Sequence, residues 1–323
     1  MPSTLLIGAG IAGLTAAREL TRQGHHVTVL DKGRGVGGRM ATRRIDQSRL
    51  DHGAQYFTAH SPDFQTFTTE LIESNVVGIW PVSDPDGQFP HYIGCEGMSA
   101  IAKHMAESLD VQTGERVVRI EQISVLTGQG WRVTSETDRT FEADNLLITI
   151  PAPQALTLLH DSDIDADAVD FTTLETIQYA PCITVMVVLK RPSQLPHPGS
   201  LRPDHGPVAW LADNFQKGIS PNQPSVTIQA NPAFSQAHFD NDLMGVGHAL
   251  LGQLAEYIPP ADILTYQVHR WRYSMAEVRH PEPYLRAQTP APLLFGGDGF
   301  GTGNVEGAFL SGLAMARAVS AGQ

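Results

Sequence analysis

The sequence predicts an α/β protein of two domains, one of which is discontinuous and carries the other as an insertion. Three observations support this. A glycine-rich segment at 8–13 lies between two short apolar runs within the first thirty-one residues. Two later apolar runs, at 145–150 and 292–295, are typical of buried parallel strands. Between about 165 and 285, short strands alternate apolar and polar residues, which indicates a mixed, largely antiparallel sheet.

The first segment has the spacing Gly-x-Gly-x-x-Gly, then a helical pattern, a second strand and Asp31. This order predicts a Rossmann-type dinucleotide-binding unit. The turn and the helix start offer glycine backbone and unpaired N–H groups to a pyrophosphate. We expect those contacts from Gly8, Gly10, Ile11, Ala12 and Gly13. Asp31 stands where a carboxylate can accept both hydroxyls of an adenosine ribose, so NAD and FAD both remain open here.

Two later segments favour FAD. Gly37-Gly38-Arg39 follows the second strand, where glycines let the backbone approach a second stretch of an extended cofactor and Arg39 can pair with its pyrophosphate. Gly297-Asp298 ends the last strand, and Asp298 can bind a ribityl hydroxyl. The helix from Val305, with Asn304 as its expected N-cap, would then direct N–H groups at the flavin. The other cofactor contacts expected are Lys32, Met40, Ala54, Gln55, Tyr56, Val118, Pro151, Glu306 and Ala308.

Composition limits the function classes. The net charge is −12 and charged residues make up 17%, so nucleic acid and anionic membranes are not expected partners. Cys95 and Cys182 lie in no metal-ligand spacing, and we expect no metal; a disulfide between them stays open. The first strand begins beside Met1 and no run reaches the length of a membrane span, so we expect a cytoplasmic protein.

We expect an FAD-binding domain from 1–60, 110–160 and 290–323, and a substrate domain from 61–109 and 161–289. Helices are expected from Ser61-Pro62, over 97–109, from about 154, near 235–257 and over 305–319. Hairpin-forming strands are expected at 117–120 and 131–134, and short strands between 76 and 95 with a turn at 84–87. In the substrate domain, strands are expected at 183–189, 208–211, 225–230 and 266–273.

Candidate substrate contacts gather in three places. Gln55 and Tyr56 follow a Gly-Ala turn, where the ring could contact substrate or pack in the core. Along the strand near residue 271, alternation puts His269, Trp271 and Tyr273 on one face, with the neighbouring arginines on the other. That face either walls a substrate cavity or belongs to the core. Trp210 and Asn214 stand at a strand end, and Asn214 could bind a carboxamide.

Hydride transfer to a flavin needs no enzymatic acid or base, so we assign none. The 13 histidines are scattered, and His25, His26 and His104 are expected at the surface or in packing. Between residues 161 and 289, the larger part of the substrate domain, the only lysines are Lys190 and Lys217. Flavin-dependent amine oxidases commonly use a lysine joined through water to flavin N5, so this scarcity disfavours an amine oxidase.

Taken together, the motifs resemble those of renalases. They are Gly8-x-Gly10-x-x-Gly13, Asp31-Lys32, Gly35-x-Gly37-Gly38-Arg39-Met40, Asp51-x-Gly53-Ala54-Gln55-Tyr56-Phe57, Thr149-x-Pro151-Ala152-Pro153-Gln154-Ala155, His269-Arg270-Trp271 and Gly297-Asp298 with Val305-Glu306-Gly307-Ala308. The resemblance covers nearly the whole chain and is strongest at both ends. It implies a p-hydroxybenzoate-hydroxylase-like two-domain fold with non-covalent FAD in the amine-oxidase-like superfamily, and the bacterial type of renalase.

Bacterial-type renalases oxidise off-pathway dihydro isomers of nicotinamide dinucleotides to NAD(P)⁺. They pass hydride to flavin N5 and electrons to O₂, giving H₂O₂. The resemblance therefore implies a small-molecule substrate, a nicotinamide dinucleotide isomer, with O₂ as second substrate. Two alternatives stay open: an amine oxidase or desaturase-like flavoenzyme, and a flavin-binding electron-relay protein without substrate oxidation of its own.

Overall fold

The computed structural model describes residues 1–82, 89–126, 128–162, 164 and 167–321. The chain divides into two compact units, each assembled from separate pieces. Unit 1 comprises Met1–Gly38, Ala102–Gln178 and Ala276–Gln323, and unit 2 comprises Arg39–Ile101 and Tyr179–Met275. Helix α3 (Ser99–Ala106) and strand β16 (Ile263–Val278) each contain one of the boundaries.

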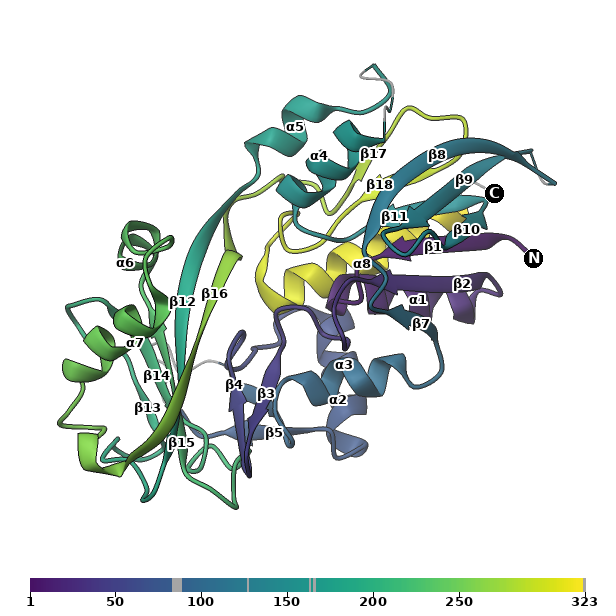
Figure 1. The fold of residues 1–323 in the computed structure, drawn as a ribbon. Helices are drawn as coiled ribbons and strands as arrows, with labels where there is room; N and C mark the ends of the chain where they lie inside the picture. The colour runs from purple at the N-terminus through teal and green to yellow at the C-terminus, as the bar shows by residue number, and fades with distance from the viewer. Residues whose placement is uncertain (83–88, 127, 163, 165–166, 322–323) are drawn as a thin grey trace. The chain divides into compact units, whose positions relative to one another are not determined.

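Unit 1 is built on a six-stranded sheet with the order β17-β18-β11-β1-β2-β7 (Figure 1). Its strands are β1 (Ser3–Ile7), β2 (His26–Asp31), β7 (Asp110–Thr113), β11 (Asn145–Ile148), β17 (Leu285–Arg286) and β18 (Leu293–Phe295). All pairs are parallel except β17–β18. Every residue of β11 and β18 is buried, as expected for central parallel strands covered on both faces. The two later apolar runs are thus confirmed as strands of the sheet that contains β1.

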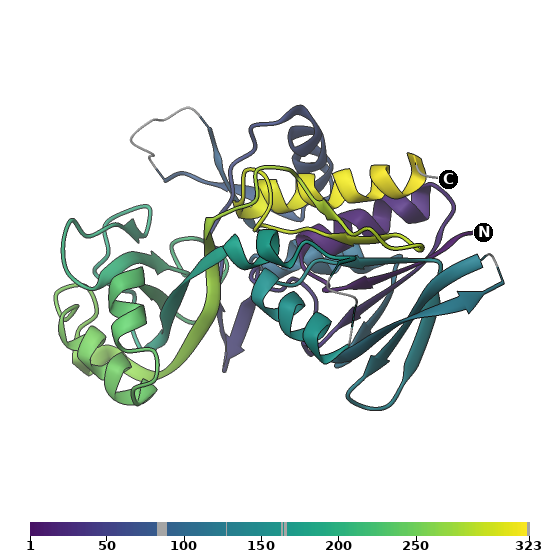
Figure 2. The same ribbon diagram turned by 90° about the horizontal axis from the view of Figure 1, so that it is seen from above.

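Helices cover one face of this sheet and a second, smaller sheet lies on the other (Figure 2). Helices α1 (Ile11–Arg22) and α8 (Asn304–Ala321) run side by side. A Cβ on Gly312 would lie 2.1 Å from the Ala12 carbonyl oxygen, so the two helices touch through their backbones. The opposite layer is the antiparallel sheet of β8 (Val117–Val125), β9 (Gly128–Ser135) and β10 (Thr140–Ala143), which confirms the expected hairpins.

Two further helices of unit 1 follow β11, namely α4 (Ala152–Asp161) and α5 (Phe171–Thr176). Trp131 on β9 is fully buried, and its indole N–H donates to the Pro292 carbonyl at 3.0 Å. This bond fixes the small sheet to the segment that leads into β18. The N-terminal, middle and C-terminal pieces of unit 1 therefore share one core.

Unit 2 contains a five-stranded sheet with the order β13-β14-β15-β12-β16. Besides β16, its strands are β12 (Gln178–Leu189), β13 (Ser200–Leu201), β14 (Val208–Asp213) and β15 (Ser225–Ala230). One face packs against α6 (Pro232–Ala237) and α7 (Leu243–Gly252), which precede the short 3-10 helix η1 (Pro260–Asp262). Alternate residues of β12, such as Ile183, Val185 and Val187, are fully buried in this core.

The other face of that sheet carries the hairpin of β3 (Thr42–Ile45) and β4 (Ser48–Asp51). Ile45 and Leu50 pack on Met186 and Val188 of β12, and Thr227 donates to the Asp51 carbonyl at 2.9 Å. These contacts place residues 39–60 with unit 2, whereas the sequence boundary was expected at 60. Unit 2 also contains α2 (Pro62–Glu73) and the pair β5 (Val77–Trp80) and β6 (His91–Gly94).

The expected single helix near 235–257 is wrong: α6 and α7 are separate. Asn231 and Asp242 each cap a helix, accepting from the N–H groups of Phe234 at 2.8 Å and Gly245 at 2.7 Å. The second cap starts a new helix where the sequence pattern runs on. The expected helix after Ser61-Pro62 is confirmed as α2. The expected turn at 84–87 lies outside the described residues.

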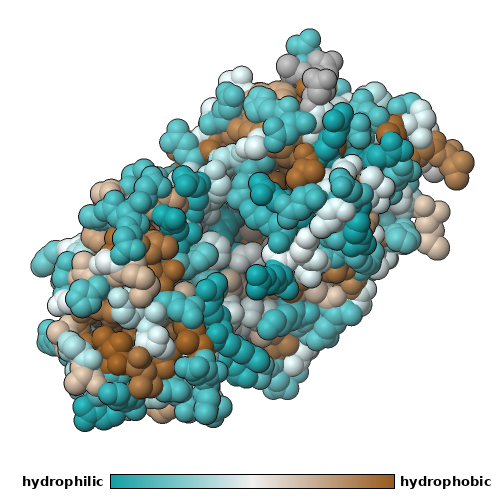
Figure 3. Space-filling view, viewed as in Figure 1, coloured by the Kyte–Doolittle hydropathy of each residue, from teal (hydrophilic) through white to brown (hydrophobic). Residues whose placement is uncertain are grey.

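In the space-filling view the visible surface is mostly hydrophilic. One group of hydrophobic residues lies at the lower left, over α7 (Figure 3). Met244 in α7 is 49% exposed. No helix in the described part of the chain is long and apolar enough to cross a membrane.

Candidate functional site

The two glycine-rich turns of unit 1 lie against each other. The Gly37 N–H donates to the Ala9 carbonyl at 2.8 Å. A Cβ on Gly38 would lie 3.5 Å from the Gly10 Cα, and Gly38 has a φ of 53°, a left-handed conformation that favours glycine. Two segments that the sequence assigned to one cofactor are thus brought together as a surface of bare backbone.

Helix α1 begins beside this surface with its first turn open. Its N-cap is Gly10, and no side chain caps it. A Cβ on Gly13 would lie 2.0 Å from the Gly8 carbonyl oxygen and 2.9 Å from the Thr149 hydroxyl, so only glycine lets the helix approach β1 this closely. The N–H groups around Ile11 and Ala12 are of the kind that bind a pyrophosphate. This uncapped helix start and the Gly10–Gly38 approach fit a dinucleotide.

Asp31 links the first glycine-rich turn to the segment that leads into the second. Its carboxylate accepts from the Ala9 N–H at 2.7 Å and from the Gly33 N–H at 2.6 Å, one bond on each oxygen. A carboxylate oxygen has a second lone pair, so both oxygens can still accept a ribose hydroxyl. The sequence indicated the ribose role but not this backbone role.

At the C-terminal end of the chain, α8 starts differently from the expectation. Asn304 is the first helical residue and has a φ of 58°. The Gly307 N–H donates to the Gly303 carbonyl at 2.7 Å, so Gly303 and not Asn304 occupies the N-cap position. Val305 and Glu306 form the first turn and Ala308 is buried. Between β18 and α8, the Gly297 N–H donates to the Ser311 hydroxyl at 2.8 Å, and Asp298 is half-buried.

Three further cofactor candidates lie elsewhere in unit 1. Lys32 donates to the Gln154 side chain at 3.0 Å, and Pro151 is the N-cap of α4. Val118 is 39% exposed and occupies a bulge of β8, between the residues that pair with β9. Nothing in the structure tests their contact with a cofactor, so that contact stays a prediction.

In unit 2, the remaining cofactor candidates form a tight crossing of two segments. The Ala54 N–H donates to the Arg39 carbonyl at 2.9 Å, and a Cβ on Gly53 would lie 1.9 Å from the same oxygen. Met40 is buried. The Arg39 guanidinium donates to the carbonyls of Tyr273 and Ser274, each at 3.3 Å. The Gly-Ala turn is therefore held against the strand that leads into the β3–β4 hairpin.

The predicted alternation along β16 is confirmed. His269 and Trp271 lie edge to face with ring centroids 4.4 Å apart, and Trp271 stacks on His52 at 5.3 Å. The indole N–H of Trp271 donates to the His52 carbonyl at 2.7 Å. Tyr273 on the same face packs edge-on against Tyr179. On the opposite face, the guanidinium groups of Arg270 and Arg272 both lie over the Phe239 ring.

The two imidazoles on this face are held in their neutral form. Burial, with smaller contributions from His269 and Arg43, lowers the pKa of His52 to about 3. Burial and the charge of Arg43 also lower the pKa of His269. The Nδ1 atom of His52 is buried without a hydrogen-bond partner among the described residues. This face, which we call the β16 face, comprises Gln267, His269, Trp271, Tyr273 and His52.

Tyr56 and Trp210 lie in a second aromatic cluster. Tyr56 stacks on His91 with centroids 4.0 Å apart, lies 5.8 Å from Trp210, and its hydroxyl accepts from Arg202 at 2.8 Å. Gln55 is buried: its amide donates to the Asp51 and Gly53 carbonyls at 2.7 and 3.1 Å. The side-chain amide oxygen of Gln55 and the indole nitrogen of Trp210 are buried without a hydrogen-bond partner among the described residues.

Asn214 is fully buried and bonded to the protein, since its amide donates to Thr227 at 3.1 Å. Beside this network lies a fully buried ion pair, Lys217 with Asp51, at 2.7 Å. Lys217 also donates to the Gln55 carbonyl at 2.6 Å, and its ammonium lies 5.1 Å from the centre of the Trp80 ring. Burial lowers the pKa of Lys217, while the Asp51 carboxylate opposes that shift.

The sequence patterns did not indicate His52, Arg202 or the Asp51–Lys217 pair. His52 and Asp51 stand inside the motif Asp51-His52-Gly53, which was a usable signal. Lys217 lies in an unremarkable turn 166 positions away from Asp51, and no local pattern links the two.

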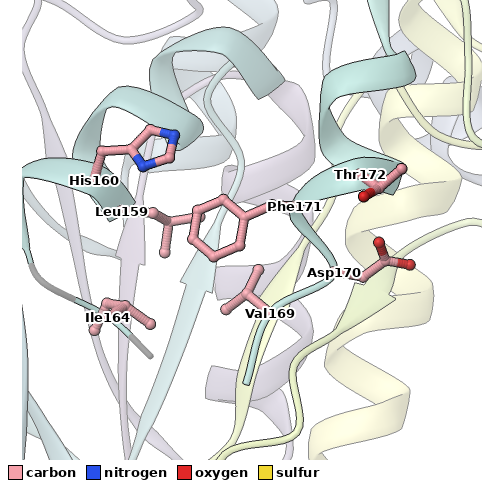
Figure 4. Close-up of a pocket in the computed structure, with 7 residues that line it drawn as sticks. All are labelled: Leu159, His160, Ile164, Val169, Asp170, Phe171 and Thr172. Atoms are coloured by element: carbon pink, nitrogen blue, oxygen red, sulfur yellow. The ribbon is translucent and has the colours of Figure 1, made fainter. Parts of the chain in front are cut away.

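The cysteines, the metal-ligating side chains and the pocket near α4 give weaker evidence of a functional site. Cys95 is exposed and Cys182 buried, and both are free, so they form no disulfide. No group of three or more metal-ligating side chains occurs within the described ranges. A pocket of about 360 Å³ is lined by His160, Asp170 and Phe171 at the C-terminal end of α4 (Figure 4). The glycine turns instead adjoin the N-terminal end of that helix, where Gln154 meets Lys32.

The fold and the glycine surface are those of a Rossmann-type dinucleotide-binding protein. The description "NAD(P)-binding Rossmann-like domain" matches residues 6–71, and "Flavin containing amine oxidoreductase" matches residues 86–320. The second match covers most of the chain, and the chain belongs to the flavin-containing amine oxidoreductase family. The predictions of an FAD-dependent oxidoreductase with a Rossmann-type fold are confirmed.

Individual relatives agree. The chain is 25% identical over 341 residues to renalase of Mus musculus, covering 98% of each chain, which confirms the predicted resemblance to renalases. It is 43% identical over 67 residues to a putative flavin-containing monoamine oxidase of Mycobacterium tuberculosis, 15% of that protein. Among solved structures, a putative protoporphyrinogen oxidase from Exiguobacterium sp. 255-15 has a TM-score of 0.74 at 14% identity over 100% of this chain and 99% of that one. Putrescine oxidase bound to putrescine has a TM-score of 0.70 at 16% identity over 99% of each chain.

Proposed function

We propose that this protein oxidises dihydro isomers of nicotinamide dinucleotides to NAD(P)⁺ with O₂ as the electron acceptor. The overall reaction is balanced: the hydride lost by the donor, one proton and O₂ together give H₂O₂. FAD, when bound, supplies the chemistry by taking up the hydride at N5 and returning two electrons to O₂. The bacterial type and the cytoplasmic location belong to the same proposal.

In this proposal unit 1 binds the cofactor. The open start of α1 and the Gly10–Gly38 surface hold the pyrophosphate, and Asp31 holds the ribose. Asp298 binds the ribityl chain, and the first turn of α8 directs its N–H groups at the flavin ring. No residue needs to exchange a proton with the donor carbon, because the hydride leaves directly.

The β16 face is the observation that carries the choice of donor. Its rings are neutral at physiological pH, since the pKa of His52 is about 3 and that of His269 is lowered. The charged groups beside it are Arg39 and Arg43, which would repel a cationic amine. A planar neutral ring joined to an anionic group suits this surface.

The contacts of Lys217 also disfavour an amine as the donor. Its ammonium is fully buried and engaged by Asp51, the Gln55 carbonyl and the Trp80 ring. An ammonium has three N–H donors, so little capacity is left for a water that would serve an amine oxidase reaction. Lys190, the other lysine of unit 2, is exposed and donates to the Ala261 carbonyl.

The test is anaerobic mixing of the FAD-loaded protein with candidate donors, followed by flavin absorbance. Dihydronicotinamide dinucleotide isomers should bleach the flavin within a single turnover, and readmitting O₂ should give one H₂O₂ per NAD(P)⁺ formed. Bleaching by amines alone would favour the amine-oxidase alternative. If no organic donor bleaches the flavin, the electron-relay alternative is favoured and the proposal fails.

A further inference from the structure

The β3–β4 hairpin presents two neighbouring arginines to opposite sides. Arg43 pairs with Leu50 across the hairpin, and directly paired residues project to the same side. Leu50 packs on Met186 of β12, so the Arg43 side of the hairpin faces the five-stranded sheet. Arg44 alternates with Arg43 and projects to the other side.

Arg43 has spare donors beside the β16 face. Its guanidinium donates a hydrogen bond to the side-chain oxygen of Gln267 at 3.2 Å. An arginine has five N–H donors, and Arg43 is exposed, so most of them are available to a ligand. Arg49 on the same hairpin is different, because it pairs with Glu96 at 3.3 Å.

The aromatic rings and this cation lie along one strand face. Gln267, His269 and Trp271 alternate on the same side of β16, and a strand rises about 3.4 Å per residue, so Gln267 and Trp271 are roughly 14 Å apart. The charge of Arg43 is felt by both imidazoles between these ends. The face can therefore hold a ring near Trp271 and an anionic group toward Gln267.

We infer that Arg43 is a specificity-determining residue that binds a phosphate of the nicotinamide donor, so that phosphate-bearing donors are preferred to phosphate-free ribosides. The inference rests on the proposed function. A guanidinium matches phosphate oxygens through two parallel N–H bonds, which a lysine cannot reproduce.

The experiment compares two reduced donors, the dihydro isomers of nicotinamide mononucleotide and of nicotinamide riboside. They carry the same ring and differ in one phosphate. The second-order rate constant of anaerobic flavin bleaching is measured for the wild type, Arg43→Ala, Arg43→Lys and Arg44→Ala. Arg43→Ala should lower the mononucleotide constant about tenfold to a hundredfold and the riboside constant less than twofold. Arg43→Lys should fall between, and Arg44→Ala should match the wild type.

Equilibrium binding gives a second readout without turnover. Titration with oxidised nicotinamide mononucleotide and riboside, followed by calorimetry, should show the same loss for the phosphate-bearing ligand alone. An unchanged preference in Arg43→Ala, or an equal loss in Arg44→Ala, would overturn the inference while the proposed function stands. If the dinucleotide isomers bleach the wild-type flavin but the mononucleotide does not, the inference fails and the proposed function stands. If none of these donors bleaches it, the proposed function fails and the inference with it. Retained flavin and an unchanged melting temperature in each variant show that the fold is intact.

Discussion

Units 1 and 2 form their proposed functional surfaces from different chemistry. In unit 1 the surface is backbone: Gly37 bonds to Ala9, and Gly38 lies against Gly10. In unit 2 it is side chain on side chain, as in Trp271 with His52 and Lys217 with Asp51. The first surface depends on side chains being absent at fixed spacing. The second depends on pairs that are distant in sequence.

The largest effect is expected from breaking the buried pair of unit 2. Lys217→Met leaves the Asp51 carboxylate buried without its cation, which should lower the free energy of unfolding by about 3–5 kcal/mol. Urea unfolding measures this. Lys190→Met, at the exposed lysine of the same unit, should change stability by less than about 0.5 kcal/mol. Equal losses in the two variants would show that the buried pair has no special role.

The backbone surface of unit 1 should break at a single methyl group. Gly13→Ala puts a Cβ 2.0 Å from the Gly8 carbonyl, so α1 must shift at a cost of roughly 3 kcal/mol. Because the shift moves the helix start, FAD retention after gel filtration should be lost as well. Gly24→Ala is the control, since a Cβ there meets nothing within 4 Å, although its φ of 89° adds some strain. Full flavin content in Gly13→Ala would contradict the assigned surface.

The smallest effect concerns the neutral imidazole of the β16 face. The pKa of His52 is about 3 in the folded protein, against about 6.5 when unfolded, so between these values the unfolded chain binds more protons. Stability therefore falls as pH falls through this window. From pH 6 to 4.5, His52 should account for about 2 kcal/mol of that loss. His52→Phe should remove this part, and His205→Phe, at an exposed histidine, should not. Parallel pH profiles for wild type and His52→Phe would refute the assignment.

The same comparison explains how much the sequence could predict. The strands around Gly8–Gly13, the runs at 145–150 and 292–295, and the alternation along β16 follow from local patterns, and all are confirmed. These features depend on glycine spacing and on the periodicity of apolar residues, and both can be seen in the local sequence.

What the sequence could not predict depends on distant partners. Asp51 meets Lys217, and Arg43 meets Gln267, across turns that give no local signal. The split between α6 and α7 depends on the Asp242 cap, which competes with a helical pattern that continues through it. Helix α8 starts at a left-handed Asn304, and Gly303 takes the N-cap position that capping preference assigned to Asn304.

The backbone contact between α1 and α8 sets the order in which the protein can mature. Gly312, which packs on Ala12, is translated about 300 residues after it. At about 5–20 residues per second, α1 waits roughly 15–60 s for its neighbour. The pieces of unit 2, which end at Met275, are complete before then. The Ala12 side of α1 therefore has no packing partner from α8 until the last piece of unit 1 has been translated.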